Sequence, residues 1–359
     1  MRTRIIRSAD IYHLISHVGL DALMDQMIHQ LRQALLAYDE SDHELPIRDG
    51  FNYTEPFPGL VEWMPIMKKA HSATIKVVGY HPDNPERRGL PSVLSTIGIY
   101  DIDSGHLKGL GDATFLTALR TGAASAIASE CLAKKSSSVV GMIGVGAQSV
   151  TQLHALGRLF PIEKILINDI DPNAEASFVT RIKALIPATV EIRAVPVELL
   201  VQSADILCTS TSIGVGEGPL FEDREVRPWL HVNAVGADFP GKTELPLNLL
   251  KRSLVVPDFA RQAMKEGECQ RLDAGDIGPD LASVVQGEID IDDIQQRLTV
   301  FDSTGYALED QVAIRMLLDY CDELDLGVDV QLETATGDPR NPYDLGEQSA
   351  NKEARIQEA

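Results

Sequence analysis

The sequence predicts an α/β fold with a Rossmann-type NAD-binding domain, on the basis of three observations. The chain has 359 residues, which is enough for two domains of ordinary size. From about residue 138, apolar strands alternate with amphipathic helices, a pattern typical of a parallel sheet covered on both faces. A glycine turn joins the first of these strands to the next helix, as in folds that bind dinucleotides.

The first part of the chain, to about residue 125, mixes one long helix with short strands. Residues Ile11–Leu36 carry apolar side chains at helical spacing, so we expect a single helix there. Three strand-like runs bounded by turn residues follow, at Gly59–Pro65, Ala73–Val78 and Val93–Tyr100. Residues Thr114–Ala133 are rich in alanine and predict a second helix.

The second part repeats a strand–helix pattern. We expect helices over residues 149–160, 173–186 and 196–204, and a returning helix over residues 306–324. The polar chain from about Thr334 contains proline and glycine and predicts a draped or disordered tail. Strands are expected within residues 138–146, 164–171, 190–195, 205–212, 230–237, 253–258 and 298–305.

The glycine turn has features of a dinucleotide site. Gly144 permits the tight turn, and Gly146 lets the backbone approach a pyrophosphate at the start of the helix that includes Ala147 and Gln148. The next strand ends about 25 residues later, at Asp169. A carboxylate there binds the ribose hydroxyls and repels a 2′-phosphate, which favours NAD over NADP. The alternative to a dinucleotide site is a strand–helix turn that needs glycine only for its backbone geometry.

A second motif points to a different class of protein. Residues Gly236–Thr243 satisfy the P-loop pattern of nucleotide hydrolases. Asp238 would place a carboxylate inside the phosphate cradle, and Pro240 lacks one backbone donor. We therefore favour the reading of Asp238 as an acid at the carboxyl end of a sheet strand, where α/β folds bind ligands.

Composition argues against several partners and compartments. Acidic residues outnumber basic ones by 53 to 32, for a formal charge of -21, which disfavours nucleic acids and anionic membranes. Four widely spaced cysteines, no secretory signal and no apolar run long enough for a membrane span predict a cytoplasmic protein. His13 and His17 share a helix face but lack a third ligand, so we expect no metal.

Several segments resemble the ornithine cyclodeaminase/mu-crystallin family, with motifs most similar to those of bacterial ornithine cyclodeaminases. They are VEWMP, KVVGYHPDN, ALRTGAAS, GVGAQS, HVNAVGADFPGKTEL and LTVFDSTGYALED, in order between about residues 10 and 330. The resemblance implies a Rossmann domain inserted in a discontinuous α+β substrate-binding domain that pairs in a homodimer. The implied parts are residues 1–125 and 311–335 for the substrate domain, 126–310 for the NAD domain and 336–359 for the tail.

The resemblance also implies site residues. Arg48, Lys76 and Arg120 would hold the carboxylate of an amino-acid substrate, Glu62 would bind an amino group, and Asp238 would be the catalytic carboxylate. Contacts to NAD are implied for Thr121, Asn233 and Gly236 in addition to the glycine turn. Judged without the resemblance, Arg120 also fits a structural ion pair, and Glu62 and Lys76 also fit exposed strand positions.

The implied reaction is the conversion of L-ornithine to L-proline and ammonia. Hydride passes from the substrate Cα to NAD+, the side-chain amine closes the ring as ammonia leaves, and the hydride returns. An NAD-dependent amino-acid dehydrogenase or ketimine reductase on the same scaffold is an alternative, as is a non-enzymatic binding protein. Ornithine and lysine differ by one methylene, which is worth only about 1–3 kcal/mol in a pocket, so the choice between them stays open.

Overall fold

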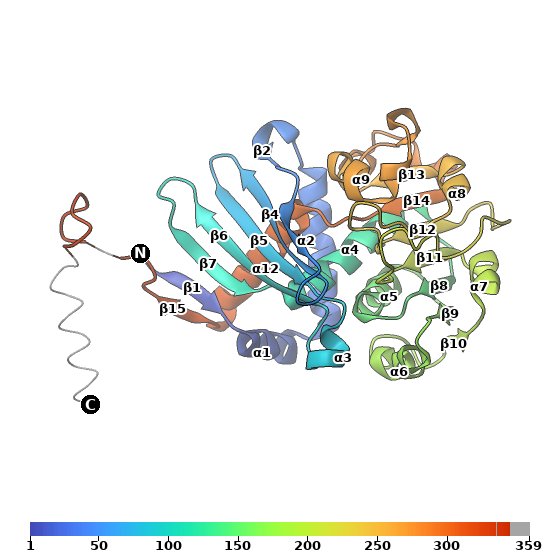
Figure 1. Ribbon diagram of the computed structural model, residues 1–359, viewed down its shortest axis with the longest axis horizontal. Helices are drawn as coiled ribbons and strands as arrows, with labels where there is room; N and C mark the ends of the chain where they lie inside the picture. The colour runs from blue at the N-terminus through green and yellow to red at the C-terminus, as the bar shows by residue number, and fades with distance from the viewer. Residues whose placement is uncertain (335, 345–359) are drawn as a thin grey trace.

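The computed structural model describes residues 1–334 and 336–344. Within them the chain forms two β-sheets, with helices between and around them (Figure 1). Most of the predicted tail, residues 345–359, lies outside the described residues.

One sheet is parallel throughout, with the strand order β10-β9-β8-β11-β12-β14-β13. The connections run in opposite directions from the β8–β11 boundary, which makes that boundary the usual ligand position in an open α/β sheet. Strands β11, β12 and β14 are buried along their whole length, which explains their continuous apolar character. The strands are β8 Val139–Ile143, β9 Lys164–Asn168, β10 Glu191–Ala194, β11 Ile206–Thr209, β12 His231–Ala234, β13 Leu254–Pro257 and β14 Thr299–Asp302.

Helices cover both faces of this sheet (Figure 1). All seven strands and the helices predicted after residue 138 are present, which confirms the Rossmann-type prediction, although α6 ends before the predicted position. The helices are α5 Ala147–Leu159, α6 Pro172–Ile182, α7 Val197–Ser203, α8 Leu247–Lys251, α9 Ala260–Glu266, α10 Leu281–Val285 and α11 Ile291–Ile294, with 3-10 turns η2 Glu268–Arg271 and η3 Ala274–Asp276.

The other sheet has eight strands and is mostly antiparallel, in the order β15-β1-β7-β6-β5-β4-β2, with β3 also paired to β4. Strand β15, near the end of the described chain, pairs with β1, so this sheet is built from segments on both sides of the Rossmann strands. This confirms the predicted insertion. The strands are β1 Thr3–Ile6, β2 His43–Glu44, β3 Asp49–Tyr53, β4 Gly59–Lys68, β5 Ser72–Tyr80, β6 Val93–Asp101, β7 Leu107–Asp112 and β15 Val328–Val330.

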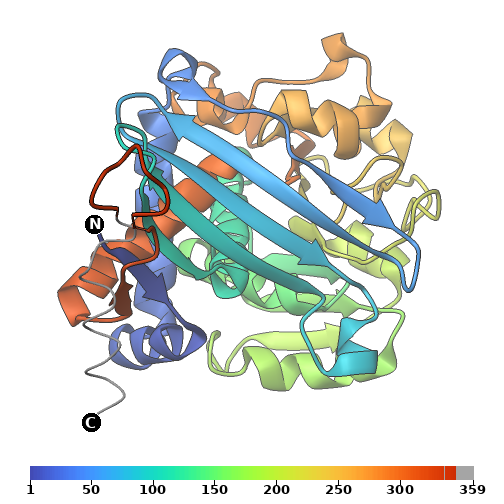
Figure 2. The same cartoon turned by 60° about the vertical axis from the view of Figure 1, so that its left-hand side comes forward.

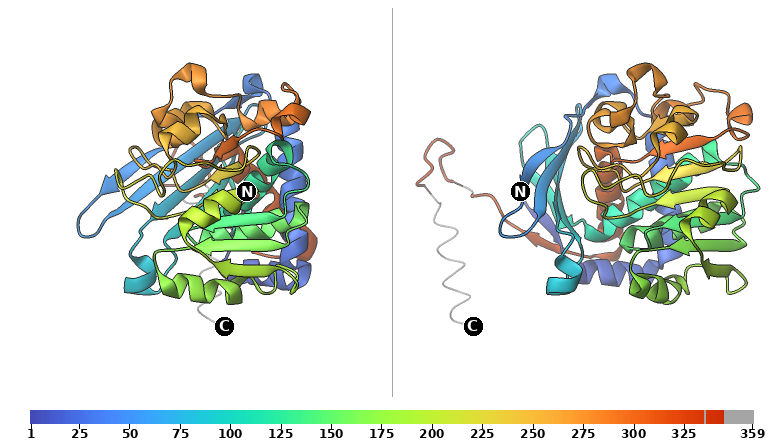
Figure 3. Two further views of the ribbon diagram at one scale, coloured as in Figure 1. Left: turned by 90° about the vertical axis from the view of Figure 1, so that its right-hand side faces the viewer. Right: turned by 45° about the vertical axis from the view of Figure 1, so that its right-hand side comes forward.

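Three helices lie between the two sheets, as the right-hand view of Figure 3 makes visible: α2 Leu20–Leu36, α4 Thr114–Leu132 and α12 Ala307–Leu324. Fourteen of the 19 residues of α4 are buried, because its small side chains allow close packing on both sides. The predicted domain limits at residues 125 and 310 fall inside α4 and α12.

The prediction of one long helix over Ile11–Leu36 was wrong in one respect. The structure has two helices, α1 Ser8–Val18 and α2, separated by Gly19. Gly19 has a φ of 85°, a backbone conformation that glycine adopts without the cost imposed by a Cβ. The apolar spacing continues through both helices and concealed the break. The remaining short elements are α3 Asn84–Arg88 and η1 Glu40–Asp42.

Candidate active site

The glycine turn lies at the carboxyl end of β8. Gly144 has a φ of 79°, and a Cβ on it would lie 2.8 Å from Thr211 Cγ2 and 2.9 Å from Ser210 O, so only glycine fits. Gly146 precedes α5, and a Cβ there would meet no heavy atom within 4 Å. This glycine therefore faces open space, beside the unpaired N–H groups of a helix of 13 residues.

The open space beside Gly146 is a cavity of about 690 Å³ lined by the turn, by the start of α5 and by α6. Gln148 has a buried Oε1 with no hydrogen-bond partner among the described residues. An open glycine beside the free N–H groups of a helix N-terminus suits a pyrophosphate, whereas Gln148 Oε1 is an acceptor and suits a hydroxyl or N–H donor. Ser149, where many such turns have a third glycine, is buried and donates to Gly146 O over 2.6 Å.

Asp169 directly follows β9 and is hydrogen-bonded to two residues that line this cavity, Val145 and Asp171. Its carboxylate accepts hydrogen bonds from Val145 N at 2.7 Å and from Asp171 N at 2.9 Å. Both oxygens keep lone pairs for a ribose hydroxyl. Arg181 was not predicted from the sequence; it lines the cavity and donates to Val145 O, Gly146 O and Ala174 O. Arg181 therefore holds the glycine turn against α6.

The other residues expected to contact NAD have partners inside the protein. Thr121 donates its hydroxyl to Thr117 O at 2.8 Å. Asn233 is fully buried and donates to Ser129 Oγ at 2.9 Å. Gly236 donates its N–H to Glu244 Oε2 at 2.9 Å. Their contact with a cofactor stays a prediction.

The basic residues predicted to hold a carboxylate lie beside acids of α12. Lys76, on β5, is 1% exposed, and its Nζ lies 2.8 Å from Asp310 Oδ2. Arg120, on α4, donates from Nη1 to Glu309 Oε2 at 2.7 Å, and its Nε lies 3.1 Å from Asp310 Oδ1. Asp310 thus bridges the two cations. Burial lowers the pKa of Lys76 to about 8 and raises the pKa of Glu309 to about 8.

These pairs leave hydrogen-bond donors unused. An ammonium has three donors and a guanidinium has five, more than the acids of α12 occupy. Arg120 also lies against Gly305, where a Cβ would come within 3.0 Å of its Nη2. Lys76 is therefore not an exposed strand residue, while Arg120 does form the ion pair considered as an alternative and still has donors for a ligand.

Arg48 contacts both Glu62 of the eight-stranded sheet and loops that follow strands of the parallel sheet. Its Nη1 donates to Thr304 O at 3.0 Å and its Nη2 to Asp238 O, on loops that follow β14 and β12. Its Nε lies 2.5 Å from Glu266 Oε1 and 3.7 Å from Glu62 Oε2. Glu62, on β4, is only 13% exposed, and burial raises its pKa while Arg48 opposes that shift. Glu266 had not been predicted from the sequence.

Asp238 lies on the loop after β12, where its carboxylate is 42% exposed and pairs with Lys242 Nζ at 2.9 Å. The next helix, α8, begins only at Leu247 and has five residues. A P-loop needs its lysine at the start of a longer helix. The structure therefore supports the reading of Asp238 as an acid at a strand end and argues against the P-loop.

Asp302, at the end of β14, is fully buried and accepts hydrogen bonds from Glu268 N at 2.9 Å and Cys269 N at 2.8 Å. Burial raises its pKa to about 7. It holds η2 in place beside the site. All four cysteines are free thiols, and no cluster of three or more metal-binding side chains occurs in the described part of the chain.

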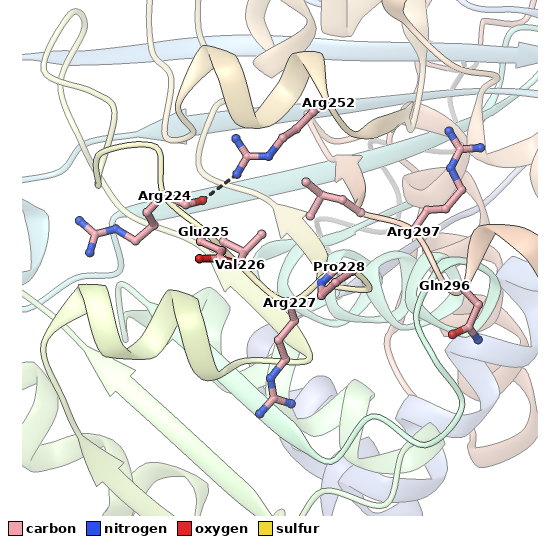
Figure 4. Close-up of a pocket in the computed structure, with 9 residues that line it drawn as sticks. Arg224, Glu225, Val226, Arg227, Pro228, Arg252, Gln296 and Arg297 are labelled. Carbon is pink, nitrogen blue, oxygen red and sulfur yellow. Dashed lines mark hydrogen bonds between the residues drawn. The ribbon is translucent and has the colours of Figure 1, made fainter.

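A second cavity, of about 600 Å³, lies at the amino ends of the parallel strands, among residues that precede β12, β13 and β14. Figure 4 shows its arginines extending in different directions. Arg252 pairs with Asp223 at 2.5 Å, and Arg227 pairs with Asp205. Arginines that diverge, two of them already in close ion pairs, do not form a binding site like that at the carboxyl ends of the strands.

Comparison with known proteins agrees with this geometry. The model of the ornithine cyclodeaminase/mu-crystallin family matches residues 9–324. The chain is similar to the L-lysine cyclodeaminase of Streptomyces rapamycinicus, with 40% identity over 96% of this chain and 100% of that protein. It is also similar to the ornithine cyclodeaminase of Agrobacterium fabrum, with 34% identity over 80% of this chain and 79% of that protein.

Solved structures show the same similarity. A lysine cyclodeaminase studied for recognition of L-lysine, L-ornithine and L-2,4-diaminobutyric acid has a TM-score of 0.92 and 43% identity, over 96% of this chain and 100% of that one. An archaeal alanine dehydrogenase dimer with bound NAD has a TM-score of 0.82 and 29% identity, over 93% and 100%. With a family match over nearly its whole length and an NAD-type site at the expected strand ends, the chain belongs to the ornithine cyclodeaminase/mu-crystallin family.

Proposed function

We propose that the chain catalyses the NAD-dependent cyclodeamination of an L-diamino acid, releasing ammonia and a cyclic imino acid. The sequence led us to L-ornithine, which would give L-proline. The lysine cyclodeaminase relative aligns over its full length and favours L-lysine, which would give L-pipecolate. One methylene separates the two substrates, so both belong in the first test.

The observation that carries this proposal is the mixture of buried cations and carboxylates beside the carboxyl ends of the parallel strands. Lys76 and Arg120 retain donors for a substrate carboxylate. Glu62 and Asp238 are acids suited to amino groups, and Arg48 joins them through its contacts with Glu62 and Asp238 O. An amino acid with a second, cationic amine matches both sets of charges.

NAD+, when bound, supplies a reversible hydride acceptor for the substrate Cα. The glycine turn, Gln148 and Asp169 would hold its pyrophosphate and ribose, beside Arg181. Lys76 and Arg120 would fix the substrate carboxylate and thereby orient the Cα. Asp238, held by Lys242, would exchange protons with the amines.

The test is incubation of the purified protein with NAD+ and either L-lysine or L-ornithine, followed by mass spectrometry for pipecolate, proline and ammonia. Cyclodeamination gives these products without net change in absorbance at 340 nm. Accumulation of NADH with L-alanine would instead favour the dehydrogenase alternative, which has a similar relative in the archaeal alanine dehydrogenase. Absence of any cyclic product from either diamino acid contradicts the proposal.

We also propose that the chain forms a homodimer through the uncovered face of the eight-stranded sheet, which faces the viewer in Figure 2. Phe51, Ile75, Val77 and Leu94 are between 38% and 67% exposed, and the strand register places them on that face with Trp63. A face this apolar favours a partner, and the archaeal neighbour is a dimer. Val77→Glu should give a monomer in size-exclusion chromatography with light scattering; an unchanged dimer would place the interface elsewhere.

A cytoplasmic location remains part of the proposal. The four free cysteines suit a reducing compartment. Among the described residues, no helix combines the length and apolar character needed to cross a bilayer.

A further inference from the structure

Glu266 is a buried carboxylate to which the preceding mechanism gives no role. It is the last residue of α9, and its side chain is only 7% exposed. Its Oε1 lies 2.5 Å from Arg48 Nε, the same nitrogen that lies 3.7 Å from Glu62 Oε2. Two carboxylates therefore lie within 4 Å of the same Arg48 nitrogen.

Asp238 adds a third negative charge to this group. Arg48 donates to the main-chain oxygen of Asp238, and the charge of Asp238 influences the pKa of both Glu62 and Glu266. Lys242 is the partner of Asp238, and Lys76, whose charge also acts on Glu62, is paired with Asp310. Arg48 is therefore the cation in contact with both Glu62 and Glu266. Two carboxylates with one guanidinium carry a surplus negative charge in a buried place, which is costly unless a cation joins them.

The position of Glu266 is fixed by its surroundings. At the next residue, Gly267, a Cβ would come within 2.5 Å of the Asp302 carboxylate. Asp302 also accepts the N–H groups of Glu268 and Cys269. Gln270 then accepts the N–H of Gly241 at 2.7 Å, which ties η2 to the loop that carries Asp238. Glu266 is thus held beside Arg48 by a segment that is anchored to Asp302 and to Gly241.

We propose that Glu266 is a specificity-determining residue that binds the side-chain ammonium of the diamino acid and takes its proton before ring closure. This inference rests on the proposed cyclodeamination. In the transfer one proton moves from the ammonium to the carboxylate, which leaves a neutral amine with a lone pair for attack and a protonated Glu266. An amino acid with an uncharged side chain, such as alanine, has only its α-ammonium and brings no side-chain cation to offset the surplus charge.

The protonation behaviour of the site agrees with this role. Burial raises the pKa of Glu266 to about 7, with Arg48 opposing the shift and Glu62 and Asp238 adding to it. A carboxyl group that exchanges protons near neutral pH is suited to general acid–base work. The ionised form is needed to receive the ammonium, so activity falls as the pH drops below that value.

The test compares the variant Glu266→Gln with wild type and with Glu130→Gln. Glu130 pairs with Arg32 at 2.5 Å, the same length as the Arg48–Glu266 pair, but it lies at the surface between α4 and α2. The measurements are kcat and KM for L-lysine and L-ornithine, the pH profile, and the dissociation constants of NADH and of the cyclic products. In these products the ring ammonium is bonded to the Cα and no longer lies at the end of a side chain.

We expect Glu266→Gln to raise KM for the diamino acid at least about tenfold, which is about 1.4 kcal/mol, and to remove the acidic limb of the pH profile near 7. NADH and cyclic-product binding should stay within about twofold of wild type, Glu266→Asp should recover part of the lost affinity, and Glu130→Gln should behave as wild type.

Two results would overturn the inference. One is equal weakening of substrate and cyclic product, which indicates a structural role; the other is an unchanged KM and pH profile. Failure of the proposed function itself is distinguishable, because the wild-type protein would then form no cyclic product from either diamino acid.

Discussion

Replacing Gly146 with alanine should weaken NADH binding while leaving the fold intact. A Cβ on Gly146 would meet no heavy atom within 4 Å, and its φ of -74° is available to alanine. The cost to folding is confined to the start of α5, where alanine is a poorer N-cap than glycine by about 1 kcal/mol or less. The new methyl group would occupy the space where the pyrophosphate meets the helix.

Gly144→Ala is the matched variant. We expect it to destabilise the fold, which Gly146→Ala should leave intact. A φ of 79° costs a residue with a Cβ about 1–2 kcal/mol. Contacts of 2.8 Å with Thr211 Cγ2 and 2.9 Å with Ser210 O add overpacking of about 1–3 kcal/mol. We therefore expect Gly144→Ala to lower the free energy of unfolding by about 2–5 kcal/mol.

The assay pairs NADH fluorescence titration with urea unfolding of both variants. For Gly146→Ala we expect the dissociation constant of NADH to rise by a factor of ten or more, about 1.4 kcal/mol, with an almost unchanged urea midpoint. If Gly146→Ala binds NADH as tightly as wild type, the pyrophosphate does not lie at this turn and the assignment of the cofactor site is refuted.

Three further predictions concern individual carboxylates. Asp238→Asn should retain NADH binding and lose about 100-fold or more in kcat; retained turnover would remove Asp238 from the mechanism. Asp310→Ala leaves Lys76 and Arg120 without their shared acid and should cost about 3–5 kcal/mol in urea unfolding; a loss below about 1 kcal/mol would mean that solvent screens the pair. Burial raises the pKa of Asp302 from 3.8 to about 7, so the folded protein keeps a proton that the unfolded chain releases. The free energy of unfolding of wild type minus that of Asp302→Asn should therefore be largest below pH 3.8 and fall as the pH rises to about 7; a difference that grows over this range contradicts the shift.

The Rossmann half of the fold could be predicted because its signals are local. Each buried parallel strand is a short apolar run, and each helix repeats its apolar residues every three or four positions. The same locality explains why Gly144, Gly146 and Asp169 could be placed correctly at the turn after β8 and at the end of the next strand; their contact with NAD stays a prediction. The break at Gly19 was missed because the periodicity of α1 and α2 is nearly in phase across it.

The partners of the site residues could not be predicted, because they meet only through tertiary structure. Glu266 reaches Arg48 from a short helix after β13, and nothing in its local sequence distinguishes it from a surface acid. Asp310 lies in a segment that carried the family resemblance, but its bridge between Lys76 and Arg120 depends on the packing of α12 against α4 and β5.

The pairing of β15 with β1 also bears on how the protein is made. Strand β1 lies between β7 and β15, yet residues 328–330 are synthesised long after residues 3–6. A ribosome releases the Rossmann strands, which end at Asp302, before it releases β15, so the inserted domain can become native while β1 still has an unpaired edge. Open edges recruit other strands. A nascent chain stalled or cut before residue 328 would therefore expose this edge, and should depend on chaperones more than the finished protein does.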